Sequence, residues 1–336
     1  MCQFAHKPRI VIVNSPHPNW DYEEKELGQL AEIKVVRCGS YDELFSLCRD
    51  ADILMVGDIK HVPLTRDVLK RFPNLKLISV YGVGVDAIDL NAASELGILV
   101  ANAPEYGVED VADHTLALML SLLRRIPMLD NELRKRGWNN IRANIKDLRE
   151  KFGAFRRLSN LVIGLIGFGK IGRAVAKRLQ PFGCKIIAYD PYVPDHVFQQ
   201  HRVEKSDFES LLSSSDVVSI HVTLSRETYH LIGEKAFQLM KDGSMLVNTS
   251  RGEVVDEEAL IKALKSGKLL GAALDVFEKE PLPKNHPLTK MPNVILSPHI
   301  AWYSEEAMME QKRETVLNVK EFLLGRRPPY LVKFPK

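Results

Sequence analysis

The sequence predicts an α/β protein with two doubly wound parallel sheets, each covered by helices on both faces. Short runs rich in β-branched residues alternate with longer helical patterns along the 336 residues, which is typical of parallel sheets joined by helical crossovers. The strand-like runs begin twice, at Arg9 and again at Leu161. Because a chain of this length is also too long for one small core, we expect two domains and not one barrel.

Eleven runs are predicted to be strands. Those of the first half are Arg9–Asn14, Lys34–Arg37, Ile53–Val56, Lys76–Val80 and Leu99–Ala101. Those of the second half are Leu161–Ile166, Lys185–Tyr189, Val217–His221, Met245–Asn248, Gly271–Leu274 and Val294–Leu296. No fixed-period repeat or low-complexity segment interrupts this alternation.

Three other segments are predicted from their spacing and polarity. Val108–Arg124 is expected to be a long helix whose continuous apolar face packs between domains or subunits. Arg134–Arg157 is polar, basic and weakly periodic, so we expect a connecting excursion there. Ser304–Gly325 has helical spacing again. The domain boundary is expected near Asn102–Pro104.

The composition excludes several classes of partner. Hydrophobic residues make up 45% of the chain, charged residues 26%, and the net charge is +3, as in an ordinary globular protein. Without a strong basic stripe, nucleic acid is not an expected partner. Without an apolar run of about eighteen residues, neither is a membrane. The four cysteines form no CxxC pair and no spacing that suits zinc, so no metal is expected. Reduced thiols and a start without a signal-peptide pattern predict a cytoplasmic protein.

The strongest local motif is a glycine-rich turn between a predicted strand and a predicted helix. Gly167, Gly169 and Gly172 form the pattern GxGxxG directly after Leu161–Ile166. In a dinucleotide site the first glycine permits a tight turn, the second lets the backbone approach a pyrophosphate, and the third lets helix and strand pack closely. The pyrophosphate would lie at the helix N-terminus, where N–H groups and the helix dipole favour an anion.

An acidic residue after the next strand supports this interpretation, because GxGxxG alone is equally compatible with a plain glycine turn. Asp190 follows Lys185–Tyr189, where a carboxylate accepts hydrogen bonds from the adenosine ribose and repels a 2′-phosphate. The next residues, Pro191-Tyr192-Val193, include no arginine. We therefore expect NAD as the cofactor, in preference to NADP.

A second glycine pair, Gly82-Val83-Gly84, also follows a predicted strand. It lacks the third glycine, because Ala87 occupies that place, and Asp86 beside it would repel a phosphate. This loop is a poor phosphate site, but its exposed N–H groups are suited to a small carboxylate.

An arginine, a glutamate and a histidine each follow a late predicted strand. They are Arg251, Glu280 and His299, and ligands of doubly wound folds bind at the carboxyl ends of the strands. A guanidinium binds a carboxylate through two parallel hydrogen bonds. A carboxylate beside an imidazole favours the protonated ring and keeps a proton available near neutral pH.

Such a set suits the reduction of a keto acid. A cation binds the substrate carboxylate, a general acid protonates the carbonyl oxygen, and a neighbouring group tunes that acid. Each residue alone has a structural alternative: Arg251 as a surface ion pair, Glu280 as a loop charge before proline, and His299 as a helix-entry residue. The combination favours catalysis.

The chain resembles the D-isomer-specific 2-hydroxyacid dehydrogenases from about Lys76 to Gly325. The segments that carry the resemblance are GVGVDAIDL, NAPEYGVEDVADHTLALML, GLIGFGKIGRAVA, LVNTSRGEVVDEEAL, GAALDVFEKEPLP and SPHIA. The resemblance implies two Rossmann-like domains: a discontinuous, flavodoxin-like substrate domain (residues 1–102 and 302–336) and an inserted NAD-binding domain (residues 103–301). It also implies a homodimer joined largely through Val108–Arg124.

The resemblance further implies that Arg251 binds substrate, Glu280 tunes the proton donor and His299 donates the proton. Positions matched to cofactor contacts are Gly167, Gly169, Lys170, Ile171, Gly172, Asp190, Thr223, Thr249, Ser250, Arg251, Asp275 and His299. Val83 and Gly84 match the place where backbone amides meet the substrate carboxylate. Tyr81 and Trp302 are expected to shape the substrate pocket.

Two features distinguish this chain within the family. Ala301-Trp302-Tyr303-Ser304-Glu305 is most similar to the C-terminal-binding-protein branch, which includes corepressors that bind NAD(H). There the tryptophan faces the substrate cavity; the alternative is that Trp302 only packs at the hinge. Some relatives carry arginine two residues before the substrate loop, where this chain has Val80 and then Tyr81, so phosphorylated or diacidic substrates are disfavoured. Because the sequence ends at Lys336, we expect no regulatory C-terminal domain.

The expected function is NAD-dependent reduction of a small monocarboxylic 2-keto acid. Hydride would pass between C4 of the nicotinamide and C2 of the substrate, with His299 as the proton donor. One alternative is an NAD(H)-sensing, corepressor-like binding protein with little turnover. Another is oxidation of formate or another one-carbon or inorganic acid.

Overall fold

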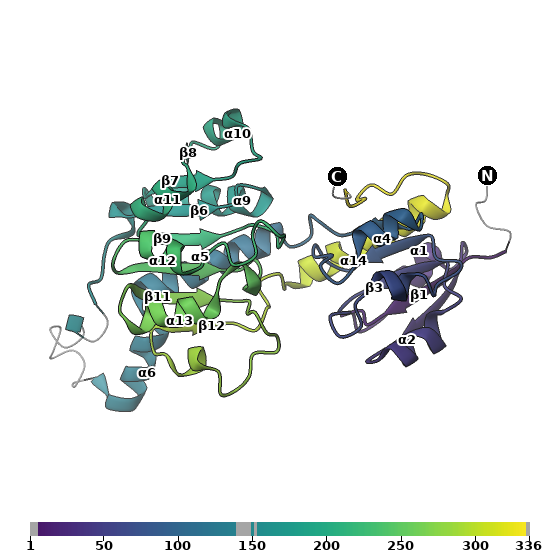
Figure 1. The fold of residues 1–336 in the computed structure, drawn as a ribbon, viewed down its shortest axis with the longest axis horizontal. Coiled ribbons are helices and arrows are strands. Elements are labelled where there is room, and N and C mark those ends of the chain that lie inside the picture. The colour runs from purple at the N-terminus through teal and green to yellow at the C-terminus, as the bar shows by residue number, and fades with distance from the viewer. Residues whose placement is uncertain (1–5, 139–148, 151–152, 334–336) are drawn as a thin grey trace. The chain divides into compact units, whose positions relative to one another are not determined.

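The computed structural model describes residues 6–138, 149–150 and 153–333. The chain forms two compact units (Figure 1). The terminal unit contains Met1–Gly107 together with Tyr303–Lys336, and the central unit contains Val108–Trp302. Each unit has its own parallel sheet and its own hydrophobic cores. The predicted α/β class with two doubly wound sheets is therefore confirmed.

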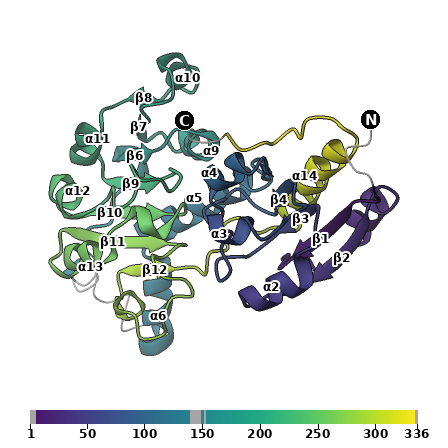
Figure 2. The same cartoon turned by 45° about the vertical axis from the view of Figure 1, so that its right-hand side comes forward.

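The sheet of the terminal unit has five parallel strands in the order β2-β1-β3-β4-β5. The strands are β1 (Arg9–Val13), β2 (Glu32–Val36), β3 (Ile53–Val56), β4 (Leu77–Val80) and β5 (Leu99–Ala101). The helices are α1 (Asp21–Leu27), α2 (Tyr41–Cys48), α3 (Arg66–Leu69), α4 (Leu90–Glu95) and α14 (Glu305–Leu323). Figure 2 shows α14 running alongside β4.

Alternating side chains of β1 point into two different cores, as expected for a strand that is covered on both faces. Ile10 and Ile12 pack in a core that includes apolar residues of α1 and α14. Val11 and Val13 pack in the other core, with α2, α3 and α4. Buried β-branched residues on both faces explain why this run is apolar throughout.

A buried ion pair joins α1 to α14. Lys312 Nζ lies 3.2 Å from Glu23 Oε2 and donates a hydrogen bond to the Asn19 carbonyl oxygen. The Tyr81 hydroxyl donates to Glu23 Oε1 over 2.8 Å. Glu23 is 0% exposed and Lys312 is 4% exposed. Since removing one member of a buried ion pair leaves the other charge uncompensated, the pair makes the two helices interdependent.

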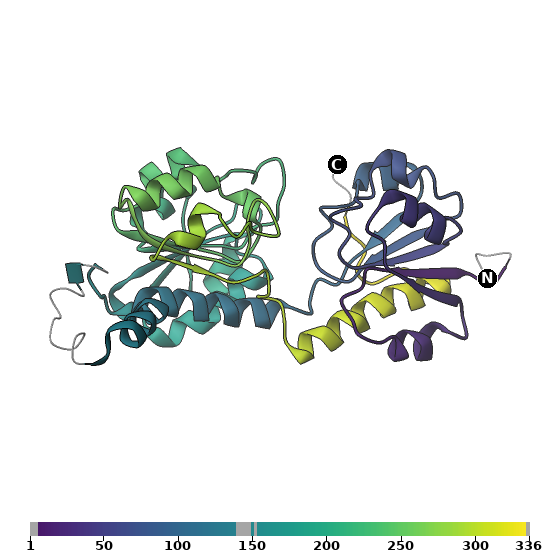
Figure 3. The same ribbon diagram turned by 90° about the horizontal axis from the view of Figure 1, so that it is seen from below.

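The sheet of the central unit has seven parallel strands in the order β12-β11-β10-β9-β6-β7-β8. The strands are β6 (Val162–Ile166), β7 (Lys185–Tyr189), β8 (Glu204–Lys205), β9 (Val217–Ile220), β10 (Ser244–Asn248), β11 (Leu269–Leu274) and β12 (Val294–Leu296). The main helices are α5 (Val108–Arg124), α6 (Ile126–Arg136), α9 (Lys170–Leu179), α10 (Asp195–Gln200), α11 (Phe208–Ser214), α12 (Glu234–Leu239) and α13 (Glu257–Lys265). Helices α5 and α9 cover one face of the sheet, and α11, α12 and α13 cover the other (Figure 3).

Helix starts follow local sequence signals. At several N-termini a serine or aspartate side chain accepts the backbone N–H three residues further on; these N-caps are Ser40, Asp89, Asp207, Asp256 and Ser304. Each such cap satisfies a donor that the helix itself leaves without a partner. Acidic residues in the first turns of α13 and α14 also complement the helix dipole.

Some predicted elements need correction. Strand β2 begins two residues earlier than predicted, at Glu32, and ends at Val36. The two-residue strand β8 was not predicted, because Glu204 and Lys205 are exposed and carry no apolar pattern. Residues 134–136 of the predicted excursion belong to α6. Residues 139–148 and 151–152 of that excursion lie outside the described residues.

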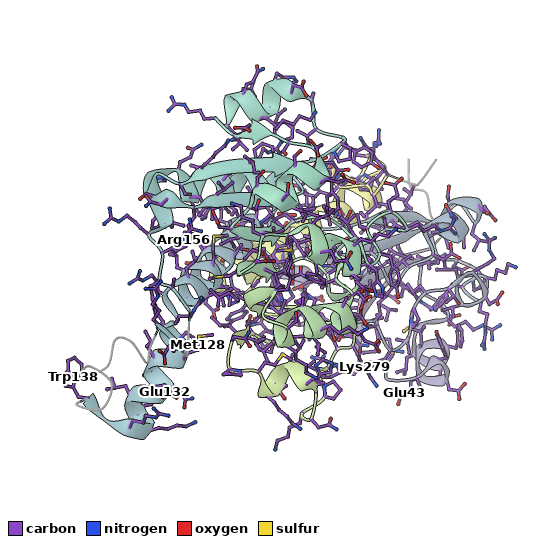
Figure 4. All side chains as sticks on the ribbon, turned by 60° about the vertical axis from the view of Figure 1, so that its left-hand side comes forward. Glu43, Met128, Glu132, Trp138, Arg156 and Lys279 are labelled. Atoms are coloured by element: carbon purple, nitrogen blue, oxygen red, sulfur yellow. The ribbon has the colours of Figure 1, made fainter. Side chains whose placement is uncertain are left out.

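The long helix at Val108–Arg124 is confirmed, but its apolar face was assigned to the wrong partner. Leu118, Met119 and Leu122 pack with α9 and with strands of the same unit. An amphipathic pattern shows that a face is buried without showing against what. Beyond α5, the helix α6 leads away from the unit (Figure 4): Met128 is 7% exposed at its base, and Trp138 is 63% exposed past its end.

No helix in the described part of the chain is both long enough and apolar enough to cross a membrane.

Glu23→Ala is expected to destabilise the terminal unit by about 3–5 kcal/mol, because it leaves the buried Lys312 ammonium and the Tyr81 hydroxyl without their carboxylate. Urea unfolding followed by circular dichroism would measure the change. Glu26→Ala is the matched control: Glu26 also lies on α1 and pairs with Lys320 of α14 over 2.7 Å, but both side chains are partly exposed. Its loss is expected to be much smaller, and equal losses would contradict the prediction.

Candidate active site

The carboxyl ends of the central unit's strands carry the residues expected to bind cofactor and to act in catalysis. From one side of the sheet to the other, β12 leads to His299, β11 to Asp275 and Glu280, and β10 to Thr249–Arg251. Strand β9 leads to Thr223, β6 to the glycine-rich turn, and β7 to Asp190. Because all strands are parallel, these loops meet at one edge of the sheet.

The backbone of the glycine-rich turn requires glycine at two of the three positions. Gly167 has φ +93°, and a Cβ there would lie 2.4 Å from the His221 carbonyl oxygen. A Cβ on Gly172 would lie 2.3 Å from the Gly167 carbonyl oxygen. A Cβ on Gly169 would meet nothing within 4 Å. The first and third glycines therefore serve close packing, and the second leaves open space beside the backbone.

The N-terminus of α9 is suited to an anion. Gly169 is the N-cap, no side chain caps it, and the first turn, which begins Lys170-Ile171, has no acidic residue. The helix has 10 residues, long enough for its N–H groups and dipole to favour negative charge at this end. The open space at Gly169 and this donor set fit the pyrophosphate of a dinucleotide.

Asp190 ties the loop after β7 to the glycine-rich turn. One carboxylate oxygen accepts the Phe168 N–H over 2.9 Å, and the other accepts the Tyr192 N–H over 3.0 Å. These bonds fix a negative charge beside the turn. A carboxylate at this point favours ribose hydroxyls and disfavours a 2′-phosphate. Thr223, in the loop after β9, is exposed, and its carbonyl oxygen accepts the Thr228 hydroxyl.

Hydrogen bonds from two neighbours hold the loop after β10 in shape. The Asn248 side chain accepts the N–H and hydroxyl of Ser250 and donates to the Arg251 carbonyl oxygen over 2.8 Å. The Thr249 hydroxyl lies 2.8 Å from that of Thr115 on α5, which donates to a backbone carbonyl, so Thr249 is the donor of the pair. The Arg251 guanidinium bonds the Ser250 carbonyl oxygen.

Glu280 and His299 form a hydrogen-bonded pair. Glu280 Oε2 lies 2.7 Å from His299 Nδ1, and the side chains are 18% and 34% exposed. The other carboxylate oxygen of Glu280 accepts the Phe277 N–H over 3.2 Å. A carboxylate at Nδ1 orients the imidazole ring and places the ring's other proton position at Nε2. The two residues that the sequence assigned to one task are thus in direct contact.

Asp275 holds the histidine loop in an unusual backbone conformation. Its carboxylate accepts the Ser297 hydroxyl at 2.6 Å and the N–H groups of Ile300 and Ala301. Its carbonyl oxygen accepts the His299 N–H over 2.8 Å. These four bonds surround His299, whose φ is +53°, a left-handed conformation that is disfavoured for a side chain of this size. The carboxylate of Asp275 therefore stabilises the loop that carries His299.

Two further residues brace this loop. His114 Nε2 on α5 lies 2.9 Å from the Ser297 hydroxyl oxygen, and neither His114 nor Ser297 was predicted to belong to the site. The Trp302 indole N–H donates to the His299 carbonyl oxygen over 3.1 Å. A serine two residues before the histidine and a histidine in the preceding long helix were the available signals, but nothing in the sequence shows that they meet.

The glycine loop of the terminal unit follows β4. Tyr81 is 6% exposed, and its hydroxyl donates to the Glu23 carboxylate. That hydroxyl therefore already has a partner inside the terminal unit. Val83 is 39% exposed, and its carbonyl oxygen accepts the Asn102 amide. Gly82 has φ +153°. No cluster of three metal-ligating side chains occurs among residues 6–138, 149–150 and 153–333.

The geometry defines the central unit as a Rossmann-type dinucleotide-binding domain, and comparison with known proteins identifies its family. A family model described as "D-isomer specific 2-hydroxyacid dehydrogenase, NAD binding domain" matches residues 116–301. The chain is 42% identical to glyoxylate reductase of Thermofilum pendens, over 87% of this chain and 84% of that protein. It is 39% identical to D-3-phosphoglycerate dehydrogenase of Methanocaldococcus jannaschii, over 93% of this chain but only 57% of that protein.

Solved structures agree over nearly the whole chain. D-lactate dehydrogenase of Aquifex aeolicus, complexed with NAD and lactic acid, matches with a TM-score of 0.84 and 31% identity, covering 97% of this chain and 100% of that one. Holo D-mandelate dehydrogenase of Rhodotorula graminis matches with a TM-score of 0.87 and 29% identity, covering 98% and 99%. The chain therefore belongs to the D-isomer specific 2-hydroxyacid dehydrogenase family. It is an NAD-dependent oxidoreductase that acts on a CH–OH group.

Gly252→Ala is expected to destabilise the central unit by about 3 kcal/mol or more, through overpacking. A Cβ there would lie 1.9 Å from the Phe277 carbonyl carbon and 2.4 Å from the Glu278 nitrogen. The measurement is urea unfolding followed by circular dichroism. Gly169→Ala, in the same unit but with open space at Cβ, is expected to lose less than about 1 kcal/mol. Unfolding of Gly252→Ala at wild-type urea concentrations would refute the close contact.

Proposed function

We propose that this protein reduces a small monocarboxylic 2-keto acid to the D-2-hydroxy acid with NADH, and catalyses the reverse oxidation with NAD. The observation that carries the proposal is the Glu280–His299 pair, at 2.7 Å, on the sheet edge that also presents Arg251 and the glycine-rich turn. A cation, a proton donor and a dinucleotide site are the three requirements of this reaction.

In the proposed mechanism His299 moves the proton. Glu280 holds Nδ1 and stabilises the positive charge of the protonated ring, so Nε2 is the atom that delivers the proton to the carbonyl oxygen. In the oxidative direction neutral Nε2 accepts the hydroxyl proton instead. The backbone bonds to Asp275 keep the ring in place during both steps. The bound nicotinamide supplies or accepts hydride at C2 of the substrate.

Arg251 is the proposed substrate cation. A guanidinium engages a carboxylate through two parallel bonds and also polarises the adjacent keto oxygen, which lysine does less well. Asn248 fixes the Arg251 backbone through its carbonyl oxygen, so the head group extends from a held position. The proposed substrate contacts of the terminal unit are the backbone amides of Val83 and Gly84.

The proposed cofactor contacts follow the same edge of the sheet. Gly167, Gly169 and Gly172 would shape the turn around the pyrophosphate, with the N–H groups that begin at Lys170 and Ile171 as donors. Asp190 would accept the ribose hydroxyls, and Thr223, Thr249, Ser250 and Asp275 would line the remainder of the site.

The identity of the acid is inferred from relatives and from the glycine loop of the terminal unit. Val80 and Tyr81 precede this loop, and neither offers a second cation. Two glyoxylate reductases are 42% identical to this chain, which favours a short substrate with one carboxylate. Trp302 and Tyr81 remain proposed determinants of the pocket shape.

We further propose a cytoplasmic homodimer. The inner face of α5 packs against other elements of the central unit. The surface that remains for contact with a second copy is α6 and the outer side of α5. Ile126, Leu133 and Trp138 are 54%, 39% and 63% exposed along this stretch, and large apolar side chains exposed together favour an interface. Light scattering on the purified protein would give the mass.

Purified protein is expected to oxidise NADH rapidly with one or two members of a 2-keto acid panel. The panel contains glyoxylate, hydroxypyruvate, pyruvate, and branched and aromatic acids, and the loss of NADH absorbance gives the rate. NADPH is expected to be a poor substitute because Asp190 repels a 2′-phosphate. Tight NADH binding without turnover of any acid would contradict the proposal and favour an NAD(H)-sensing binding protein.

His299→Ala is expected to lower kcat of the reductase by about a hundred- to ten-thousand-fold, the usual effect of removing a general acid. NADH affinity, measured by fluorescence titration, is expected to change little. His196→Ala removes an exposed histidine of α10 in the same unit and should leave kcat unchanged. Near-normal turnover of His299→Ala would remove this residue from the mechanism.

A further inference from the structure

Two glutamates hold the loop that carries Glu280 to the start of α13. The N–H of Glu257, the first residue of α13, donates to Glu278 Oε1 over 3.1 Å. The N–H of Glu278 donates in return to Glu257 Oε1 over 2.9 Å. Each glutamate therefore caps the backbone of the other, and the two bonds close a ring between segments 21 residues apart in sequence.

Two histidines flank this pair of carboxylates. His230 Nε2 lies 2.8 Å from Glu278 Oε1, and His286 Nε2 lies 3.3 Å from Glu257 Oε2. Glu257 is only 8% exposed, and its burial raises the pKa of its carboxyl group. The nearby Glu278 carboxylate adds to this rise in the pKa of Glu257, and the nearby His286 opposes it. The four side chains thus form one connected cluster.

The cluster lies directly beside the proposed catalytic residues along the chain. Glu278 is two residues before Glu280. The N–H of Phe277, the residue directly before Glu278, donates a hydrogen bond to the Glu280 carboxylate. Gly252, the residue after Arg251, packs so closely on Phe277 and Glu278 that no Cβ fits there. The backbone that the glutamates hold is therefore the backbone from which Glu280 projects and on which the Arg251 loop rests.

The Glu280–His299 bond depends on that backbone. A shift of about 1 Å in a positioned group is enough to cost a large factor in rate. Glu280 Oε2 meets His299 Nδ1 at 2.7 Å, and its other oxygen is already committed to the Phe277 N–H. If the loop of Glu280 shifts, the carboxylate cannot rotate to stay on His299 without breaking its bond to the Phe277 N–H.

We propose that Glu257 and Glu278, with His230 and His286, form a positioning clamp that holds Glu280 against His299. The four residues of the clamp are positioning residues and touch neither substrate nor cofactor in this role. The catalytic consequence rests on the proposed function of Glu280 and His299. The structural consequence, a fixed Glu280–His299 hydrogen bond, does not require turnover and can be tested by itself.

The test compares variants that remove the clamp with one that preserves it. Glu278→Ala and Glu257→Ala each delete one acceptor of a backbone N–H. Glu278→Gln retains an oxygen at the Oε1 position, which accepts the Glu257 N–H and lies beside His230 Nε2, so it keeps the clamp without its charge. Glu258→Ala is the matched control, because Glu258 is the next residue of α13 and is exposed.

Two readouts separate positioning from general stability. The first is the proton NMR signal of His299 Nδ1–H in protein labelled with ¹⁵N-histidine, identified by its disappearance in His299→Gln. A short bond to a carboxylate moves this signal far downfield, so it reports the Glu280 contact directly. The second is kcat, KM for the keto acid and Kd for NADH, measured on the fraction that binds NADH.

In both alanine variants the downfield signal is expected to vanish or move upfield, and kcat to fall about ten- to a hundred-fold. Kd for NADH is expected to stay within about two-fold, since the glycine-rich turn is untouched. Glu278→Gln is expected to keep the signal and most of kcat, and Glu258→Ala to match the wild type. If the alanine variants do not fold, Glu278→Asp replaces them in the test, because its shorter side chain does not reach the Glu257 N–H. It is then expected to lose the downfield signal and to lower kcat in the same way.

A wild-type signal and wild-type kcat in Glu278→Ala and Glu257→Ala would overturn the clamp. So would equal damage in Glu278→Gln and Glu278→Ala, because charge and not position would then matter. The two proposals fail in different ways. Absence of turnover in the wild-type protein, with the His299 signal still responding to the clamp variants, would overturn the proposed function and leave the clamp intact.

Discussion

The parallel arrangement of the seven strands in the central unit is the constraint on which the candidate site depends. When neighbouring strands all run the same way, every loop that follows a strand emerges at one edge. The order β12-β11-β10-β9-β6-β7-β8 then fixes which loops are neighbours. It places the loops of Arg251, Glu280 and His299 after three adjacent strands, and the glycine-rich turn between the strands that lead to Thr223 and Asp190. One antiparallel strand among them would remove its loop from the site.

Local strain at this edge is offset by hydrogen bonds that a single acidic residue accepts. His299 occupies a left-handed conformation, which costs energy for any side chain larger than glycine. Asp275 compensates with four bonds to residues 297–301. A loop held by so many bonds gives up conformational freedom on folding and not on binding, so the proposed proton donor, His299, would be positioned before substrate arrives. The Trp302 indole N–H adds a further bond to this loop, at the His299 carbonyl oxygen.

How far the sequence could predict the site depends on whether the signal is local. Gly167, Gly169 and Gly172 were predictable because each requirement is a property of one position in a strand–turn–helix unit. Glu280 and His299 required the parallel-edge rule and the family resemblance together. The Glu257–Glu278 ring and the His114–Ser297 contact were not predictable, because they join ordinary residue types across long separations. The prediction of what covers the apolar face of α5 was wrong for a related reason. A pattern of apolar residues shows that a face is buried but not which surface covers it.

Helix α5 connects these observations into one framework. Its adjacent residues His114 and Thr115 reach different loops: His114 contacts Ser297 in the loop after β12, and Thr115 accepts the Thr249 hydroxyl in the loop after β10. On the opposite face of the same sheet, α13 holds the loop after β11 through Glu257 and Glu278. Since β11 lies between β10 and β12, the three proposed catalytic loops are braced alternately from the two layers of helices. A displacement of either layer would therefore change the distance between Glu280 and His299, and the spacing of the site is a property of the whole sandwich.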